Sequence, residues 1–255
     1  MSINDRLNYV KMKVRHQNKL LPWYKKWWGV LLIIILSLVF VLVVFSAIFL
    51  FIRIKEIRTE MAEENLRISI ENYLKRIEGN GDNYYLGANK NEDDQVLEVT
   101  VFGNFSCYYS ALSSLTIKDL ANTYSNNVRF IYRDYPDPDS IILALGARCA
   151  GDQGKFWEMH DFIFELQDEL STIFDEEEKR YALLQMAEIF ELNVQSFTKC
   201  LDDKIHLSKV RRDYEDGEAL GIKGTPTWFI NAIEITGGLN KEKFEELLSA
   251  LNYIN

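Results

Sequence analysis

The feature that most constrains this chain is a run without any charged residue near its start, residues 29–52. The run is about 24 residues long, and a helix of that length crosses a hydrocarbon layer ~30 Å thick. Aromatic residues typical of a membrane interface precede it: Trp23, Tyr24, Trp27 and Trp28. The sequence therefore predicts a transmembrane helix at residues 27–52, with membrane lipid around it.

Two other interpretations of this run are less favoured. A buried helix in a soluble domain of this size does not need so long a stretch without charge. A cleaved signal peptide has a shorter apolar core with small residues at its cleavage site, whereas Ser46 and Ala47 lie inside the run. We therefore expect an uncleaved signal anchor in a single-pass membrane protein.

Charges on the two sides of the run predict its orientation. Residues 1–26 carry many Lys and Arg and a single acid, Asp5, whereas residues 53–64 are mixed in charge. Because positive charge favours the cytoplasmic side, we expect residues 1–26 in the cytoplasm and residues 53–255 outside it. That compartment is oxidising in most cells, so disulfide bonds can form there.

The composition argues against several classes of function. The net charge of -9 argues against nucleic acid as a partner, because phosphate binding needs clustered Lys and Arg. The chain has 3 cysteines and 3 histidines, with no CxxC pair and no His cluster, and we expect no polar cluster around His206. The sequence therefore predicts neither a metal site nor a cofactor.

Residues 53–94 are predicted to form a stalk and a linker. A partial apolar stripe extends a helix to about residue 78, and a loop that begins at Gly79 runs to residue 94. Glu64 and Glu71 interrupt any regular heptad, so a coiled-coil dimer is less favoured than a stalk or a helix packed on the outer domain.

Residues 95–255 alternate predicted strands and helices. A strand at residues 96–102, a helix from Cys107 to about Tyr124 and a strand at residues 128–132 predict a parallel βαβ unit. Helical segments follow at about residues 140–150, 155–166, 176–190, 194–201 and 205–220. Short strands at residues 225–230 and 233–236 precede a last helix at residues 241–251, with Asn240 as its N-cap. This order predicts an α/β domain in which helices cover a small mixed sheet.

Cys107 lies where the first of these strands gives way to a helix. A helix N-terminus leaves backbone N–H groups unpaired and carries the positive end of the helix dipole. We expect that environment to favour the thiolate, which is the reactive form of cysteine. Ser110 stands where a second cysteine would complete a redox motif.

Four segments of the outer domain resemble the DsbA-like proteins, a branch of the thioredoxin fold with a helical insertion. They occur in the family's order, at residues 101–107, 128–136, 149–164 and 220–231. The resemblance implies an α/β thioredoxin fold for residues 95–255, with the helical insertion at about residues 139–205. It also implies thiol–disulfide exchange on extracytoplasmic proteins or peptides that contain cysteine.

The resemblance further implies which residues bind the substrate. In the family, a cis peptide bond before a proline faces the reactive cysteine, and this loop binds an extended peptide as an added strand. Here the bond is Thr225–Pro226. We therefore expect substrate contacts from Tyr108, Tyr109, Thr225 and Pro226.

Cys149 and Cys200 lie in the predicted helical insertion. Some family members carry a structural disulfide at about these places, and an oxidising compartment favours it here. Two buried free thiols, or a pairing of either cysteine with Cys107, are alternatives that the sequence leaves open. His160, in the same insertion, is expected to make a structural hydrogen bond rather than to act as a base.

The chain departs from the family at the reactive motif. The usual motif is Cys-Pro-Xaa-Cys, whereas this chain has Cys107-Tyr108-Tyr109-Ser110. Without a second cysteine, the motif can neither hand over a disulfide of its own nor close one. Asn104 also occupies the place of an acidic residue that many members have shortly before the cysteine, and its amide cannot transfer a proton.

Three functions of Cys107 are compatible with this motif. In the favoured one, Cys107 forms mixed disulfides as a monothiol oxidoreductase or isomerase, Ser110 donates a hydrogen bond to the thiolate, and an external thiol or redox partner releases the product. In the second, the domain is catalytically degenerate and only binds peptides or acts as a scaffold. In the third, Cys107 is a small buried side chain without a role.

Overall fold

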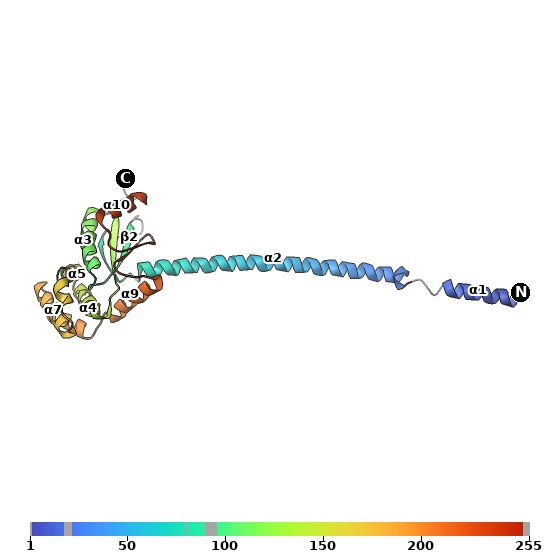
Figure 1. The fold of residues 1–255 in the computed structure, drawn as a ribbon, viewed down its shortest axis with the longest axis horizontal. Coiled ribbons are helices and arrows are strands. Elements are labelled where there is room, and N and C mark those ends of the chain that lie inside the picture. Colours follow the sequence, from blue (N-terminus) through green and yellow to red (C-terminus); the bar gives the residue numbers. More distant parts are fainter. Residues whose placement is uncertain (1, 18–21, 80, 90–95, 252–255) are drawn as a thin grey trace. The chain divides into compact units, whose positions relative to one another are not determined.

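The computed structural model describes residues 2–17, 22–79, 81–89 and 96–251 (Figure 1). The chain divides into two compact units, Met1–Ile68 and Ser69–Asn255. The first unit contains helix α1 (Ile3–Gln17), a 3-10 turn at Trp23–Lys25 and most of helix α2 (Trp27–Glu78). Part of the predicted basic segment, residues 18–21, and part of the predicted linker, residues 90–94, lie outside the described residues.

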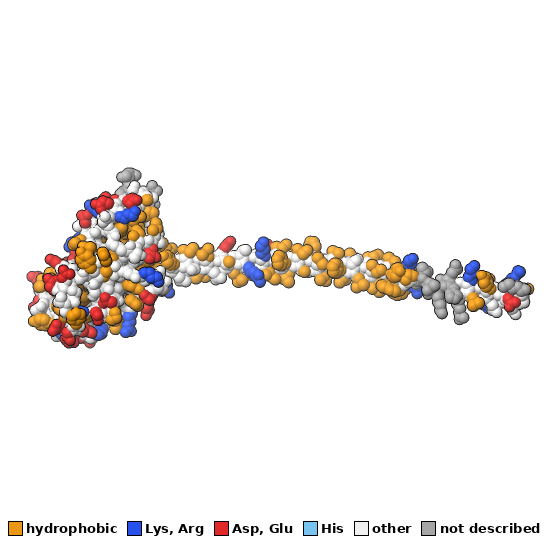
Figure 2. All heavy atoms as spheres, viewed as in Figure 1, with side chains coloured by type: hydrophobic (Ala, Val, Ile, Leu, Met, Phe, Trp, Pro, Cys, Tyr) orange, Lys and Arg blue, Asp and Glu red, His pale blue; other side chains and the backbone are white. Residues whose placement is uncertain are grey.

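Helix α2 contains the charge-free run and continues without interruption to Glu78. The most apolar window of this helix has no buried residues, so its Leu, Ile, Val and Phe side chains form an apolar surface. Figure 2 shows the nearly continuous hydrophobic surface along this part of the helix. By length and composition, α2 is able to cross a membrane.

In the described part of the second unit, five strands form one mixed sheet in the order β1-β3-β2-β4-β5. Strands β2 and β3 are parallel, with Val99 opposite Phe130, so the predicted βαβ unit is confirmed. The other neighbouring pairs are antiparallel. The strand bounds are β1 (Tyr84–Gly87), β2 (Leu97–Gly103), β3 (Val128–Asp134), β4 (Thr227–Ile230) and β5 (Ile233–Thr236).

The two faces of the sheet pack against different helices, because successive side chains of a strand point to opposite faces. Val101 belongs to the larger core, together with residues of α3 (Tyr108–Thr123) and α10 (Lys241–Ala250). Phe102 belongs to a second cluster with Phe229 and with Ile77 from the end of α2. The sheet therefore lies between two layers of helices (Figure 1).

A block of helices is inserted between β3 and β4, as in the DsbA-like thioredoxin fold. The block begins with a 3-10 turn, Pro138–Ser140, and its helices are α4 (Ile141–Gly151), α5 (Phe156–Glu165), α6 (Gln167–Ser171), α7 (Glu176–Ile189), α8 (Val194–Asp202) and α9 (Leu207–Leu220). Asn240, the predicted N-cap of α10, accepts a hydrogen bond from the Lys243 N–H at 3.0 Å.

The structure differs from the sequence prediction at strand β1, which the sequence placed in the linker. Residues Tyr84–Gly87 pair with β3, so the sheet includes residues before the predicted domain start at residue 95. The Tyr84 ring stacks on Phe156 with the ring centroids 3.8 Å apart. Residues 84–87 lie among Gly, Asn and Asp residues typical of a loop, so the sequence did not predict this strand, and its stability comes from these contacts with distant residues.

A buried cluster of opposite charges joins β3 to the inserted helices. The Arg133 guanidinium, on β3, donates to Asp213 of α9 at 2.9 Å and 2.7 Å. Arg148, on α4, donates to Asp134 at 2.5 Å and also to Asp213. Burial raises the pKa of Asp134, although Arg148 opposes the shift. Since each charge is buried with an opposite partner, removing one of them is expected to be strongly destabilising.

Candidate functional site

Cys107 is the N-cap residue of α3, directly after the turn that follows β2. Its side chain is partly exposed, and it is the free cysteine of the domain. Among the described residues, no side chain caps the start of α3. Cys107 therefore stands at the end of α3 where a helix has backbone N–H groups without an intrahelical partner.

The loop before β4 lies opposite Cys107, and its Thr225–Pro226 peptide bond is cis, as the resemblance implied. The Cys107 thiol donates a hydrogen bond to the Thr225 carbonyl oxygen, with 3.1 Å between the atoms. The Pro226 carbonyl oxygen accepts a hydrogen bond from the Gly237 N–H at 2.8 Å, which ties the loop to the turn after β5. Residues 118 positions apart in the chain thus form one site.

Ser110 is buried in the first turn of α3, with 3% of its surface exposed. Its hydroxyl oxygen accepts a hydrogen bond from the Asn104 N–H at 3.3 Å. The Asn104 amide in turn donates to Asp137 at 3.1 Å and accepts from the Ser140 hydroxyl at 2.7 Å. The sequence did not predict the roles of Asp137 and Ser140, whose contacts hold Asn104 in place.

Tyr108 and Tyr109, two of the predicted substrate-binding residues, are exposed beside Cys107. Their rings meet edge to face with 5.7 Å between centroids. Leu112 and Leu115 extend this exposed apolar surface along α3. An exposed row of apolar side chains next to a free thiol is suited to contacts with an unfolded or extended protein chain.

An aromatic layer lies behind Cys107 and contains His160. The imidazole is buried, with its centroid 5.5 Å from that of Phe105 and 4.5 Å from that of Tyr132. Burial lowers the pKa of His160 and raises that of Tyr132 well above its ordinary value. The Nδ1 atom of His160 lies 3.0 Å from the Asp161 carboxylate. This packing agrees with a structural rather than a catalytic role for His160.

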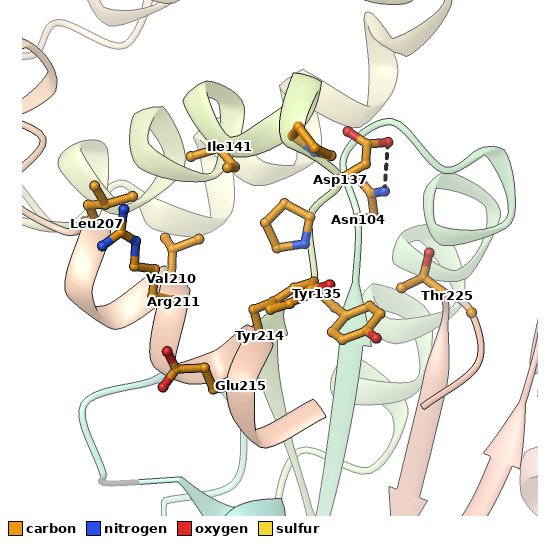
Figure 3. A pocket seen from close by; sticks show the side chains of 13 residues that line it. Asn104, Tyr135, Asp137, Ile141, Leu207, Val210, Arg211, Tyr214, Glu215 and Thr225 are labelled. Atoms are coloured by element: carbon orange, nitrogen blue, oxygen red, sulfur yellow. Dashed lines mark hydrogen bonds between the residues drawn. The ribbon is translucent and has the colours of Figure 1, made fainter. Parts of the chain in front are cut away.

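A cavity of about 730 Å³ opens next to the Thr225 loop, and the sequence did not predict it. Figure 3 shows that Leu207, Val210 and Tyr214 project into it from α9, opposite Ile141 of α4. The Tyr135 ring stacks on Tyr214 with 4.9 Å between centroids. Charged side chains at its edge are Asp137, Arg211 and Glu215. The cavity is therefore mostly apolar, and Gly224 and Thr225 of the loop before β4 form part of its wall.

Cys149 and Cys200 form a disulfide in the structure, and its sequence separation is 51 residues. The disulfide joins α4 to α8, and both cysteines are buried. The expectation that His206 has no polar cluster around it is wrong, because its Nε2 atom lies 2.8 Å from the Asp152 carboxylate. The error arises because Asp152 and His206 are 54 positions apart and meet only through helix packing.

Most of the chain matches a known protein family. A family described as Thioredoxin matches residues 85–250. A Na(+)/H(+) antiporter NhaA 1 of Salinispora arenicola is 30% identical over 148 residues, which are 56% of this chain and 21% of that protein. The chain therefore spans about a fifth of the length of this curated relative.

Solved structures with the same fold include a protein described as a thiol–disulfide exchange protein. The chain resembles alpha-DsbA2 of Wolbachia pipientis with a TM-score of 0.59 and 20% identity, over 74% of this chain and 98% of that one. It resembles oxidised BdbD of Bacillus subtilis with a TM-score of 0.54 and 21% identity, over 66% of this chain and 91% of that one. At these identities the likeness establishes the thioredoxin fold with its helical insertion.

Proposed function

The chain belongs to the thioredoxin family, and from this premise we propose that it is a thiol–disulfide oxidoreductase or isomerase of monothiol type. Cys107 is the nucleophile, and the substrates are cysteine-containing proteins or peptides. The apolar helix α2 anchors the chain in the membrane, and the charge asymmetry around it supports a cytoplasmic N-terminus with the thioredoxin domain outside.

The observation that carries this proposal is the position of Cys107 against the cis-proline loop. The sulfur lies 3.1 Å from the Thr225 carbonyl oxygen and at the N-terminus of α3. A substrate chain paired with the Thr225 backbone would place its own sulfur within reach of Cys107. Since Cys107 is partly exposed, the attacking sulfur is accessible to a disulfide in solution.

The proposed reaction has two exchange steps. First, the Cys107 thiolate attacks one sulfur of the substrate disulfide, forming a mixed disulfide, and the other substrate sulfur leaves as a thiolate that takes a proton from water. Second, an external thiolate attacks the mixed disulfide and releases the Cys107 thiolate, so the enzyme itself gains and loses no electrons over the cycle. When the second thiol belongs to the same substrate, the outcome is isomerisation.

Three other groups support these steps in the proposal. The Ser110 hydroxyl already accepts from the Asn104 N–H, and its own proton is available for a hydrogen bond to the Cys107 thiolate. Tyr108 and Tyr109 provide apolar contacts on one side of the sulfur. The cavity beyond Thr225 accommodates substrate side chains on the other side.

The direct test is the capture of a mixed disulfide with glutathione disulfide. The full chain, kept in detergent, is incubated with glutathione disulfide under native conditions and analysed by peptide mass spectrometry after acid quenching. We expect one glutathionyl group on Cys107, and its removal by added reduced glutathione. The Cys107→Ser variant is the control and should carry no glutathionyl group.

An unmodified Cys107 in the folded chain, together with ready modification after denaturation, contradicts the proposal. The rate constant for glutathionylation of Cys107 tests whether the thiol is activated. If it is, the folded chain should react faster than the denatured chain at the same pH. Equal rates in the two states also contradict an enzymatic role.

The location is tested by labelling the same thiol in intact cells. A maleimide that does not cross membranes should label Cys107 before lysis, because Cys149 and Cys200 are joined to each other. Labelling only after lysis contradicts the proposed orientation. The Cys107→Ser variant is the control, because any label found in its sample has reacted elsewhere than at Cys107.

A second candidate function, peptide binding without chemistry, is favoured by the cavity next to Thr225. In that case, Cys107→Ser binds an extended peptide as tightly as the parent chain, and the parent forms no mixed disulfide with a peptide whose cysteine is capped as a disulfide with glutathione. Fluorescence anisotropy with this capped peptide and with its Ser form distinguishes the two functions.

A further inference from the structure

Three helices of the insertion bring a separate group of potential ligands together. Cys149 lies on α4, Cys200 on α8, and His206 is the N-cap residue of α9. Their sulfur and ring nitrogen atoms all lie within 4.8 Å of one another, and all three residues are buried. This group is distinct from Cys107 and its loop.

The surroundings of His206 point to a missing partner. Its Nε2 atom lies 2.8 Å from Asp152 Oδ2, and the same oxygen lies 3.6 Å from Cys200 Sγ. Its Nδ1 atom is buried without a hydrogen-bond partner among the described residues, in a side chain that is 4% exposed. A buried polar atom usually has a partner, so an unpaired nitrogen on a ring that lies within 4.8 Å of two sulfurs indicates a site that can take a ligand.

The donor set matches the coordination chemistry of zinc. Two thiolates, an imidazole and a carboxylate are ligands that Zn²⁺ binds tetrahedrally, at ~2.3 Å to sulfur and ~2.0 Å to nitrogen. With these bond lengths, the ligand atoms around a tetrahedral zinc ion lie about 3.5 Å from one another. The sulfur and ring nitrogen atoms of this group already lie within 4.8 Å of one another, so they need to move little to bind the ion. Joined in a disulfide, however, the two sulfurs have no thiolate charge to offer.

We propose that Cys149, Cys200 and His206, together with Asp152, bind one Zn²⁺ ion when the Cys149–Cys200 disulfide is reduced. Asp152 Oδ2 lies near both His206 Nε2 and Cys200 Sγ, so it completes the set either as the fourth ligand or as a hydrogen-bond partner of the His206 ring. Its side chain is half exposed, which gives the ion a route from solvent. The site is independent of the function proposed for Cys107.

The proposed cycle consists of reduction of the disulfide, zinc binding and reoxidation. A dithiol reduces the disulfide, supplying two electrons and two protons and becoming a cyclic disulfide itself. Zn²⁺ then binds the two thiolates and displaces their two protons to solvent. A later disulfide oxidant takes two electrons from the thiolates, re-forms Cys149–Cys200, leaves as two thiolates and releases Zn²⁺. The site thus exchanges a covalent cross-link for a metal cross-link between α4 and α8.

The test uses the full chain in detergent with the Cys107→Ser substitution, so that this thiol adds no ligand. A phosphine reduces Cys149–Cys200, taking its oxygen from water, and is removed under nitrogen. Zinc chloride is then added, and tightly bound zinc is measured after gel filtration. We expect one Zn²⁺ per reduced chain and none per oxidised chain. Cobalt(II) should give the absorption bands of a tetrahedral thiolate site.

Two variants identify the ligands. His206→Ala and Asp152→Asn should each weaken zinc binding by at least about tenfold. Asp203→Asn is the matched control, because Asp203 is an exposed helix C-cap residue like Asp152, and it should bind zinc as the parent does.

A reduced, folded chain that binds no zinc overturns the proposal, as does unchanged binding in His206→Ala. If reduction unfolds the chain, circular dichroism decides instead, because zinc binding should restore the helical signal and slow alkylation of Cys149 and Cys200. Absence of both effects also overturns it.

Discussion

Cys107 and the Cys149–Cys200 pair lie in one domain but in different surroundings. Cys107 ends a loop at a helix N-terminus, is partly exposed and contacts the backbone of a second loop. Cys149 and Cys200 are 1% and 5% exposed and lie on packed helices. The comparison teaches that a sulfur at a helix N-terminus beside a cis-proline loop is accessible from solvent. A sulfur packed between helices is not accessible, and here it cross-links two of them.

The largest expected effect comes from Ser110→Cys. This change gives Cys107 a disulfide partner, as Cys149 has in Cys200. The new thiol lies one helical turn from Cys107, where the family has its second cysteine. We expect an intramolecular disulfide in air, and a fall of more than about tenfold in alkylation of Cys107 in the oxidised chain. Iodoacetamide labelling before and after reduction measures this.

Ser113→Cys is the matched control for that change, because Ser113 is also 3% exposed and lies on the same helix. It is about two turns from Cys107, which is too far for a disulfide. Alkylation of Cys107 should then remain as in the parent. Equal labelling in Ser110→Cys would show that the first turn of α3 does not permit a redox pair.

The next largest effect is on stability, from removing the buried disulfide. Cys149→Ala with Cys200→Ala opens a loop with a sequence separation of 51 residues. Chain-entropy arguments predict a loss on the order of 4 kcal/mol in the free energy of unfolding. Urea denaturation followed by circular dichroism measures the loss.

In the same double variant, glutathionylation of Cys107 should persist under conditions where the domain is folded. If the loss of stability is below about 1 kcal/mol, the disulfide is not a main cross-link of the insertion. If Cys107 loses its reactivity in the folded variant, the two sulfur sites are coupled and the contrast between them fails.

A smaller effect is expected at the cavity. Tyr214→Ala removes an aromatic side chain that lines it, worth about 1 kcal/mol in a contact with a substrate side chain. Mixed-disulfide formation with a peptide whose cysteine is capped as a disulfide with glutathione should slow by roughly threefold to tenfold, while the rate with glutathione disulfide should not change. Tyr181→Ala, on the exposed surface of α7, is the control and should change neither rate.

The smallest effect concerns pH. Burial lowers the pKa of His160 below its ordinary 6.5, so the unfolded chain binds more protons than the folded chain as pH falls through 6.5. The free energy of unfolding should therefore decrease as pH falls below about 6.5. His160→Phe, which fits the aromatic layer, should reduce this decrease.

Urea denaturation at several pH values from neutral downward measures that slope. The nearby titrating groups are Asp161 and Lys118, whose contacts are unchanged above pH 5, so the difference between parent and variant reports His160. Glutathionylation of Cys107 should be the same in His160→Phe. If His160→Phe loses glutathionylation of Cys107, the His160 imidazole takes part in the chemistry of that thiol.

Local patterns predicted most of the fold. The parallel βαβ unit, the inserted helices other than α6 and the N-cap at Asn240 follow from neighbours within a few residues, which is the range of helical and strand periodicity. Strand β1 was missed because its pairing with β3 and the stacking of Tyr84 on Phe156 are long-range contacts. The cavity was missed for the same reason, since its walls come from α4, α9 and two loops.

By itself, the sequence determined the apolar helix, the place of Cys107 at a strand-to-helix junction and the absence of a second cysteine at position 110. These depend on composition and on near neighbours along the chain. The family resemblance implied that the Thr225 loop faces Cys107 and that Cys149 pairs with Cys200, and both pairs are in contact in the structure. Only the tertiary structure decided that Asp152 and His206 lie beside the Cys149–Cys200 pair. The reason is physical: distances between residues about 50 or more positions apart are set by how helices and sheet pack.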